Sequence, residues 1–514
     1  MSISYKKSDL VNILSNIDLG SSIAELDNLL EAARIETSVF KDLIDDKIDL
    51  VPGTKGSGKS ALFRIFVDFL PKLLLKDRKV VIAHGIQKQG DTVFHAFKNQ
   101  FEKLSEDQFI SFWCIYFVSL VHEQFIKGDI YSDYLKDASK EIENFKRACA
   151  NARIPEIKAR KTLKEILEWV LNALKTNSPK LTYKLPQDSG EIELDLFGRP
   201  KSEFVKASQN DDITDKIPTY ANEIKSALES ILAKVKLNIW LMVDRLDEIF
   251  PRRTNLESRA LRGLLKTMRL FTSESIRIKV FLRDDIFENL LSTKVGFTAL
   301  THITARQADT LKWSEDQILS MIVKRFFANP TVSEYFKVNI EKLNSSFDYR
   351  KRLFYLIFPN TIHRGENQST TSRWLFNHCA DARGVVTPRD IIDLLKSAKQ
   401  FQHDTFLTDP QGKSDYLIGS VAIQHGHEEL SKRKRTTYLE AEFPHLWPDI
   451  RKFINGKSEY SASSISKILG PRWKTILDDL ISIGVISEIP RKESTIYKFP
   501  SVYWSGLNLS RGKA

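Results

Sequence analysis

The stretch IDLVPGTKGSGKSALFRIFVDFL, residues 48–70, decides the fold of this chain. Its first four residues, 48–51, are mostly apolar, as expected of a short buried strand. Residues 61–70 are almost wholly apolar, as expected of a buried helix that ends before Pro71. A second strand is predicted at residues 79–83, after a polar turn. Strand, glycine-rich loop, helix and strand in this order predict the start of a parallel α/β sheet.

The loop between strand and helix matches the phosphate-binding pattern G-x-x-x-x-G-K-[ST] without a gap. Glycines allow backbone angles that turn successive amides inward around a phosphate, and the following helix directs its positive dipole end at the same anion. We expect the Lys59 ammonium to reach the β- and γ-phosphate oxygens and the Ser60 hydroxyl to hold Mg²⁺. A chance match is the alternative, which the position between a strand and a buried helix disfavours. The residues predicted to bind the nucleotide are Gly53, Thr54, Lys55, Gly56, Ser57, Gly58, Lys59, Ser60 and Ala61.

Acidic residues follow the most apolar predicted strand, LNIWLMV at residues 237–243. Ligands of open α/β sheets bind at the carboxyl ends of the strands. We therefore expect Asp244 to hold Mg²⁺ through water and Glu248 to polarise an attacking water, with Asp247 as its rival for that role. Solvated acids at a polar strand end are the alternative. The phosphate-binding pattern earlier in the chain favours the catalytic interpretation.

These two motifs correspond to the Walker A and Walker B motifs, and together they resemble the STAND/NACHT branch of P-loop ATPases, with origin-recognition-like AAA+ proteins as near relatives. The opening Ala24-Glu25-Leu26-Asp27, followed by the loop, also resembles a group of bacterial ATPases often encoded among antiviral defence genes. The resemblance covers about residues 40–400, although the stretch 91–235 is longer than usual in the relatives. It implies that the chain binds ATP and Mg²⁺ and hydrolyses ATP.

The resemblance also implies two arginines that sense the γ-phosphate. Arg283 follows a predicted strand, and Arg389 lies in the segment 384–390, which begins a predicted lid helix. Each arginine also has a structural alternative. Arg283 could pair with the neighbouring Asp284 or Asp285 as an ordinary surface ion pair.

The length of 514 residues predicts roughly three domains at about 150 residues each. The predicted fold class is α/β, with a P-loop NTPase parallel sheet, a large helical insertion, a helical lid and a C-terminal winged-helix-like domain. The predicted segments are an N-terminal helical segment at 1–45, the NTPase core at 46–310 with its insertion at about 91–235, the lid at 311–400 and the C-terminal domain at 401–514.

Apolar residues recur at helical spacing in the C-terminal segment and are predicted to be core. They are Trp473, Ile476, Leu477, Leu480 and Ile481. The opposite face of that helix carries Asp478 and Asp479, which would repel phosphates. The basic turn at Arg491 and Lys492 is therefore the better candidate for contact with DNA, and protein docking is the alternative. The basic run at residues 432–435 is expected to be a solvated face, with phosphate contact as the less favoured interpretation.

Composition excludes several classes of function. Lys and Arg number 77 against 66 Asp and Glu, and the resulting charge of +11 permits an acidic partner without requiring one. Cys114, Cys149 and Cys379 lie far apart, so neither structural zinc nor a disulfide framework is expected. The most apolar stretch, residues 110–121, is too short to span a membrane. We expect a cytoplasmic protein.

The sequence therefore predicts an ATPase, a P-loop NTP hydrolase, whose nucleotide cycle drives a conformational switch in antiviral defence with a partner effector protein. The alternative is a nucleotide-gated DNA-binding regulator or an origin-recognition-like loader with little turnover. The candidate partners are ATP, a protein effector, DNA through Arg491 and Lys492, and further copies of the chain; no membrane is expected.

Overall fold

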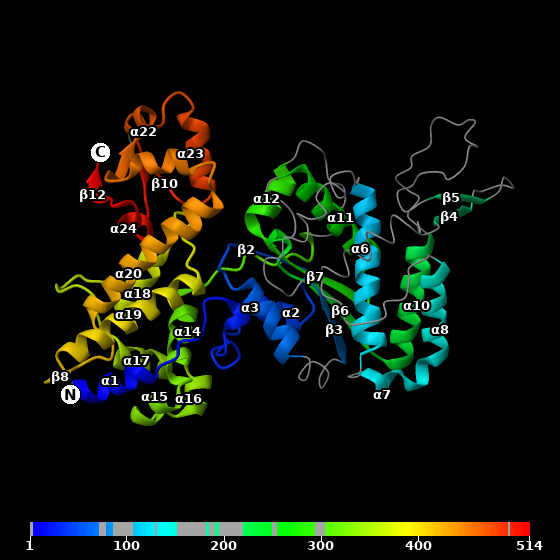
Figure 1. Cartoon of the computed structure of the whole chain (residues 1–514), viewed down its shortest axis with the longest axis horizontal. Helices are drawn as coiled ribbons and strands as arrows, with labels where there is room; N and C mark the ends of the chain where they lie inside the picture. Colours follow the sequence, from blue (N-terminus) through cyan, green and yellow to red (C-terminus); the bar gives the residue numbers. More distant parts are fainter. Residues whose placement is uncertain are drawn as a thin grey trace. The chain divides into compact units, whose positions relative to one another are not determined.

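The computed structural model describes residues 4–70, 79–85, 106–128, 131–151, 181–184, 191–194, 219–248, 254–292, 304–491 and 494–514. The chain divides into two compact units, each with its own hydrophobic core. The sheet unit comprises residues 38–53 and 62–310, and the helical unit comprises residues 1–37, 54–61 and 311–514. Figure 1 labels the elements of both.

The sheet unit is built on four strands in the order β2-β7-β6-β3 (Figure 1). The neighbouring strands of this sheet are all parallel, which confirms the predicted α/β fold class. The strands predicted from apolar runs are observed with small shifts at their ends, as β2 (Leu50–Gly53), β3 (Val80–Gly85), β6 (Asn238–Val243) and β7 (Ile276–Arg283).

Apolar side chains cover both faces of this sheet, because successive residues of a strand point to opposite sides. On one face Phe63 meets Phe281 and Phe66 meets Trp240, with ring centroids 5.7 and 6.1 Å apart. The alternate residue of β6, Leu241, belongs to the core that includes the helices of the insertion. The other helices of this unit are α2 (Ser38–Ile44), η2 (Ile65–Phe69), η7 (Leu246–Glu248), α11 (Asn255–Phe271) and α12 (Asp284–Ser292). Helix α3 (Lys59–Arg64) begins in the helical unit and belongs to the sheet unit from Leu62 onward.

The predicted insertion is mainly helical in the part that the structure describes. The apolar stretch at residues 110–121 lies within the buried helix α6, as expected. Among the described helices, none is long and apolar enough to cross a membrane. The elements of the insertion are α6 (Glu106–Val121), η3 (His122–Ile126), α7 (Ser132–Leu135), η5 (Lys136–Ala138), α8 (Ser139–Asn151), the antiparallel pair β4 (Leu181–Lys184) and β5 (Glu191–Leu194), and α10 (Thr219–Val235).

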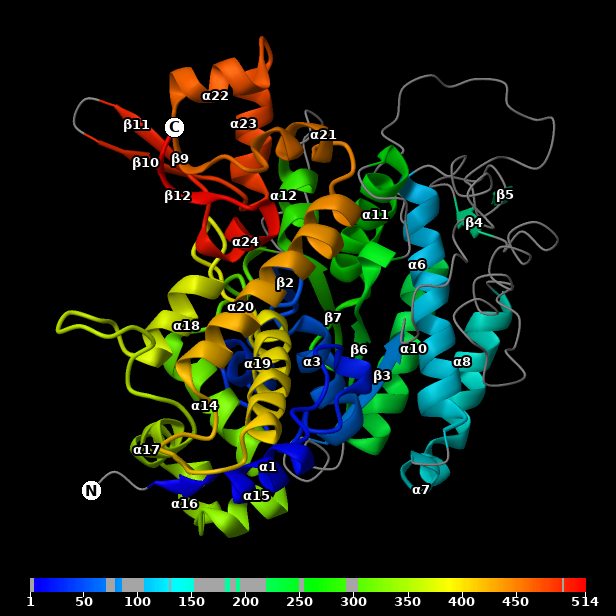
Figure 2. The same cartoon turned by 60° about the vertical axis from the view of Figure 1, so that its left-hand side comes forward.

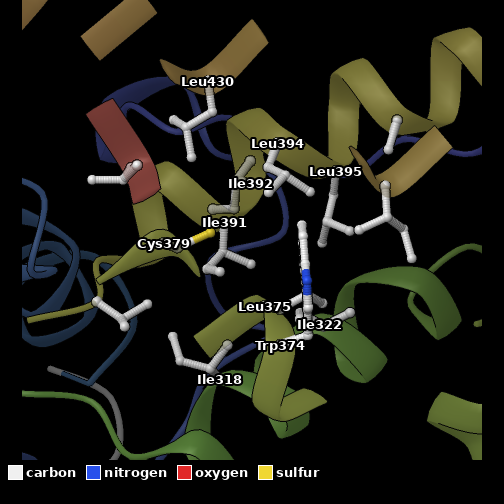
Figure 3. Packing of buried hydrophobic residues seen from close by; sticks show 14 of the residues in the cluster. Ile318, Ile322, Trp374, Leu375, Cys379, Ile391, Ile392, Leu394, Leu395 and Leu430 are labelled. Atoms are coloured by element: carbon white, nitrogen blue, oxygen red, sulfur yellow. The ribbon is translucent and has the colours of Figure 1, made fainter. Parts of the chain in front are cut away.

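The helical unit has a core built from helices of the predicted lid and of the C-terminal segment. Figure 3 shows Ile318 and Ile322 of α14 close to Trp374 of α18 and to Ile391 and Leu395 of α19. The helices are α14 (Glu315–Phe327), α15 (Pro330–Tyr335), α16 (Ile340–Ser345), α17 (Phe347–Ile357), α18 (Thr371–Cys379), α19 (Pro388–Thr408), α20 (Ser420–Lys434) and η8 (Arg435–Glu440).

The N-terminal segment is part of the helical unit. β1 (Tyr5–Lys6) pairs with β8 (Lys413–Ser414), and the buried side chains of α1 (Lys7–Asn16) belong to the same core. Beyond η1 (Ala24–Leu26), the Asp27 carboxylate accepts hydrogen bonds from both terminal nitrogens of Arg325. The N-terminal segment is therefore fixed to helices that follow residue 311.

The C-terminal part has the two short helices and the strand pair expected of a winged helix, and Figure 2 shows them together. Three of the five predicted core residues of α23 are buried, and Trp473 and Ile481 are partly buried against the same core. A strand that the sequence did not indicate, β12, pairs in parallel with β9. The elements are α21 (Trp447–Ile450), η9 (Arg451–Phe453), β9 (Lys457–Ser461), α22 (Ala462–Leu469), α23 (Trp473–Ser482), β10 (Ser487–Pro490), β11 (Thr495–Lys498), η10 (Ser501–Tyr503), α24 (Trp504–Leu507) and β12 (Ser510–Lys513).

Candidate nucleotide site

The glycine-rich loop continues directly from the last residue of β2 and ends where α3 begins at Lys59. Gly56 and Gly58 have φ angles of 82° and 101°. Residues with a side chain rarely adopt these angles, and glycine adopts them without steric cost. Such residues let successive amides face one side, which is the arrangement that binds a phosphate.

Three polar side chains of the loop, those of Thr54, Ser57 and Lys59, are buried. Lys59 is 9% exposed, and its ammonium donates to the carbonyl oxygen of Thr54 at 2.8 Å. The hydroxyls of Thr54 and Ser57 are buried and have no hydrogen-bond partner in the described part of the chain. Leaving a buried hydroxyl unsatisfied costs about 1–3 kcal/mol, so the loop fits a polar ligand such as a phosphate group.

The first turn of α19, the predicted lid helix, packs against this loop. A Cβ atom added to Gly56 would lie 3.2 Å from the Cβ of Arg389 and 3.2 Å from the hydroxyl of Thr387. Thr387 is the N-cap of α19 and accepts a hydrogen bond from the amide of Asp390. Arg389 donates through Nε to the carbonyl of Ser22 at 3.4 Å. Arg389 thus lies beside the loop, and its role as a sensor remains a prediction.

Two further contacts to the loop were not foreseen from the sequence. The indole N–H of Trp313 donates to the carbonyl oxygen of Ser57 at 2.7 Å. Lys55 forms an ion pair with Glu442, whose side chain is 4% exposed. Neither partner lies in a recognisable motif, and each is more than 250 residues from the loop, so only the folded chain shows these contacts.

At the carboxyl edge of the sheet, Asp244 follows β6 and is 3% exposed. Arg283 ends β7 and is the register neighbour of Gly53, the residue before the loop. Its guanidinium donates to the carboxylate of Asp285 at 2.9 and 2.8 Å and lies 3.5 Å from an oxygen of Asp247. The pairing with Asp285, raised above as the structural alternative for Arg283, is therefore present.

Glu248, the predicted catalytic base, is the last residue of η7; its side chain lies outside the described part of the structure. The predicted magnesium ligands are Ser60, partly buried in the first turn of α3, and the buried Asp244. Both supply oxygen atoms, the donor type that Mg²⁺ prefers. Among the described residues there is no group of three or more His, Cys, Asp or Glu that could hold a metal ion.

The basic run at residues 432–435 is neutralised by neighbouring carboxylates. All four side chains form ion pairs inside the helical unit, which supports the structural interpretation of this run over phosphate contact. The pairs are Lys432–Glu429 at 2.7 Å, Arg433–Asp393 at 3.1 Å, Lys434–Asp390 at 2.7 Å and Arg435–Glu440 at 2.8 Å.

The winged-helix surface carries exposed side chains of both signs. Asp478 and Asp479 of α23 are exposed, as expected, and so is Arg491 at the turn after β10; Lys492 lies outside the described residues. Sequence reasoning missed the other basic positions on the sheet of this domain, because neither β9 nor β12 had been recognised. On the strands of this sheet and in the turn after β10, the exposed basic side chains without an ion pair in the described structure are Lys457, Arg491, Arg511 and Lys513.

No protein-family model matches the chain, and no curated protein matches its sequence. Among solved structures, the chain is similar to the Orc1 protein of Aeropyrum pernix in complex with DNA, with 11% identity, 95% of this chain and 96% of that chain covered, and a TM-score of 0.35. It is also similar to the Orc2 protein of Aeropyrum pernix in ADPNP-ADP complexes, with 12% identity, 92% and 93% coverage and a TM-score of 0.40. A third match is Drosophila ORC bound to DNA, with 11% identity, 96% and 90% coverage and a TM-score of 0.25.

At these identities and TM-scores, the matches assign neither a family nor a function to the chain. They lend no support to the STAND/NACHT resemblance or to a defence role, which remain predictions. What the structure shows directly is an α/β protein with a parallel central sheet, a helical unit and a glycine-rich loop that begins at the carboxyl edge of the sheet.

Proposed function

We propose that this chain binds ATP with Mg²⁺, hydrolyses it, and changes the conformation of its helical unit with the nucleotide state. The observation that carries the proposal is the loop after β2. It combines the left-handed glycines Gly56 and Gly58 with the buried Lys59 and two buried hydroxyls that have no hydrogen-bond partner among the described residues. Such a loop, followed by the N-terminus of a helix, is suited to a polyphosphate.

In the proposed binding mode, the Lys59 ammonium moves from the Thr54 carbonyl to the β- and γ-phosphate oxygens. A charge-assisted hydrogen bond to phosphate is roughly twice as strong as one between neutral groups. Ser60 and Asp244 would hold Mg²⁺, which neutralises charge on the phosphates when it is bound.

For hydrolysis, Glu248 is the preferred residue to orient the attacking water. Its rival Asp247 lies 3.5 Å from the guanidinium of Arg283, so one of its oxygens is already directed to a cation. Arg283 would in turn keep Asp247 in place. This assignment makes Glu248 the group that receives the proton from water.

The conformational response is proposed to start from two contacts that the loop makes inside the helical unit. Gly56 packs against the start of α19, and Lys55 pairs with Glu442, which lies between η8 and the winged helix. A triphosphate in the loop places negative charge near Lys55 and competes with the Glu442 carboxylate. Nucleotide binding should therefore loosen the contact with the segment that leads to the C-terminal domain.

The experiment is a titration of the protein with ATP, with and without Mg²⁺, followed by steady-state phosphate release and by amide hydrogen exchange in the two nucleotide states. We expect Mg²⁺-dependent binding, turnover, and a change in exchange at residues 435–453. Absence of ATP binding at millimolar nucleotide would contradict the proposal. Binding without any change in exchange would contradict the conformational part alone.

A second candidate function, a nucleotide-gated DNA-binding regulator, rests on the unpaired basic residues of the winged-helix sheet. In a salt titration of duplex binding, each lost phosphate contact lowers the slope of log affinity against log salt by about 0.9. Replacing Arg491 and Lys492 by Ala should therefore flatten the slope by nearly two units, by the same estimate for two contacts.

The matched control is the replacement of Asp478 and Asp479 by Ala, which removes negative charge from the exposed face of α23 and should strengthen non-specific binding. If wild type has no affinity for duplex at low salt, with or without ATP, the winged helix would be a protein-docking module. Co-purification of the native complex then tests the finer prediction of a partner effector in defence.

A further inference from the structure

Trp313 occupies a fixed position immediately before helix α14. The helix start is set by a capping box, in which the Ser314 hydroxyl accepts from the amide of Gln317 and the Gln317 side chain accepts from the amide of Ser314. The Trp313 ring also packs against the core of the helical unit. The backbone beside it and the core beneath it therefore both restrain this side chain.

From this position Trp313 makes two contacts with the glycine-rich loop. Its indole N–H donates to the Ser57 carbonyl at 2.7 Å. A Cβ atom on Gly58 would lie 3.6 Å from the indole Cζ2, within ordinary van der Waals distance. The tryptophan thus contacts the peptide group that joins Ser57 to Gly58 and also the glycine with a φ of 101°.

Because the peptide bond is planar, the hydrogen bond from Trp313 also fixes the orientation of the Ser57–Gly58 peptide group. In a trans peptide, the C=O of Ser57 and the N–H of Gly58 point in opposite directions. Because the indole holds the carbonyl on its own side, the Gly58 amide faces away from Trp313. If this peptide rotated by half a turn, the loop would lose a donor and present carbonyl lone pairs in its place, which would repel a phosphate.

We propose that Trp313 is a positioning residue that holds the glycine-rich loop in its anion-binding conformation before the nucleotide arrives. The inference rests on the proposed function of the loop and adds a residue outside its motif. Trp313 needs no contact with the nucleotide for this role. Its indole N–H is essential for it, and its aromatic ring alone is insufficient.

The chain offers a matched pair of substitutions. Trp313→Phe removes the N–H and keeps an aromatic ring. Trp374→Phe makes the same chemical change at a residue of the same unit that is 5% exposed and whose indole nitrogen has no hydrogen-bond partner within the described structure. Both proteins are titrated with ATP and with ADP by calorimetry, and steady-state hydrolysis is measured alongside.

For Trp313→Phe we expect Kd to rise about three- to ten-fold for both nucleotides, the usual range for one hydrogen bond. KM should rise with it while kcat stays near wild type, because the loop amides act on bound substrate and transition state alike. Trp374→Phe should leave Kd and KM unchanged. A role confined to folding would lower the melting temperature without this separation of KM from kcat.

Wild-type nucleotide affinity in a folded Trp313→Phe protein would overturn the inference while leaving the proposed function intact. If wild type and Trp374→Phe also fail to bind nucleotide, the proposed function itself fails. Should Trp313→Phe not fold, Trp313→Leu provides the second test, because leucine keeps apolar contact with the core and has no side-chain hydrogen-bond donor. Wild-type affinity in that variant would again contradict the role of the N–H.

Discussion

Two buried lysines, one in each unit, have partners of different kinds. Lys279 in the middle of β7 is fully buried; its ammonium donates to the carboxylates of Asp46 and Asp49 and to the carbonyl of Ile48. Lys59 at the start of α3 donates to the carbonyl of Thr54 in its own loop. The hydrogen bonds of the first lysine join segments more than 200 residues apart, whereas the bond from Lys59 to Thr54 spans five residues.

This comparison distinguishes a lysine whose charge stabilises the fold, Lys279, from a lysine whose charge is suited to a ligand, Lys59. To move, Lys279 would have to leave two carboxylates in a buried region, which is strongly unfavourable. In its bond to Thr54, Lys59 can exchange a neutral carbonyl for a phosphate oxygen and gain a stronger hydrogen bond. Removing each lysine should therefore affect a different property of the protein, and the predictions that follow test that separation.

The largest effect is expected for Lys59→Ala. Binding of ATP with Mg²⁺ and all hydrolysis should be abolished, because the β- and γ-phosphates lose their cation. Thermal stability without nucleotide should change little. Calorimetric titration together with thermal unfolding measures both. If a folded Lys59→Ala protein binds ATP with wild-type affinity, the assignment of the loop as a nucleotide site is wrong.

Lys279→Met should show the opposite pattern. Removing one partner of a buried ion pair costs about 3–5 kcal/mol, and of the described cations Asp46 and Asp49 would keep those of Arg277 and Arg306. Urea unfolding measures the loss. The control is Lys47→Met, since Lys47 pairs with Asp42 and Asp45 but is largely exposed and should have no measurable effect. Equal effects of the two substitutions would contradict the structural role of Lys279.

Glu248→Gln separates binding from chemistry at the loop. The amide keeps the shape of the side chain but cannot take a proton from water, so turnover should fall by about 10²-fold or more while ATP affinity is retained. Asp247→Asn is the comparison. If only Asp247→Asn loses turnover, the roles are exchanged; if neither does, the catalytic assignment fails.

The smallest effect is expected on the pH dependence of stability, through the buried and neutral side chain of His378. Burial lowers the pKa of His378 to about 4, below its ordinary value of about 6.5. The unfolded chain therefore binds a proton more readily, and the stability that the neutral ring contributes is lost as pH falls from about 6.5 towards 4. His378→Asn should flatten this acid limb in thermal unfolding at stepped pH. His427, which faces His378, also has a lowered pKa and should leave a residual slope.

The parts of the molecule that the sequence predicted are those with a local signal. The strand, loop and helix around residues 48–70 follow from apolar runs and glycine spacing, and the apolar run at 237–243 gave both a strand and the position of Asp244. The two C-terminal helices and their strand pair were predicted in the same way. Each of these depends on residues close together in the chain.

The contacts that shape the loop could not be predicted, because their partners are distant and have no periodic pattern. Trp313 and Glu442 are ordinary loop and helix residues until the fold brings them to Ser57 and Lys55. The basic run at 432–435 shows the converse. It is a conspicuous local signal, and all four of its side chains form ion pairs with carboxylates of the same unit. A charged run can be interpreted only with its neighbours in space.

The attachment of the N-terminal segment to the helical unit has a consequence for the synthesis of this protein on the ribosome. Asp27 is made early, but its partner Arg325 is 298 residues further along the chain. At about 5–20 residues per second, that interval lasts roughly 15 to 60 s. Leu10, Ile13 and Leu14 belong to the core of the helical unit in the folded chain. During this interval most of the residues that they pack against have not yet been synthesised. Throughout that time these apolar side chains lack their final core, so they are prone to aggregation. The sheet unit is also synthesised before residues 311–514 of the helical unit, and it can fold first.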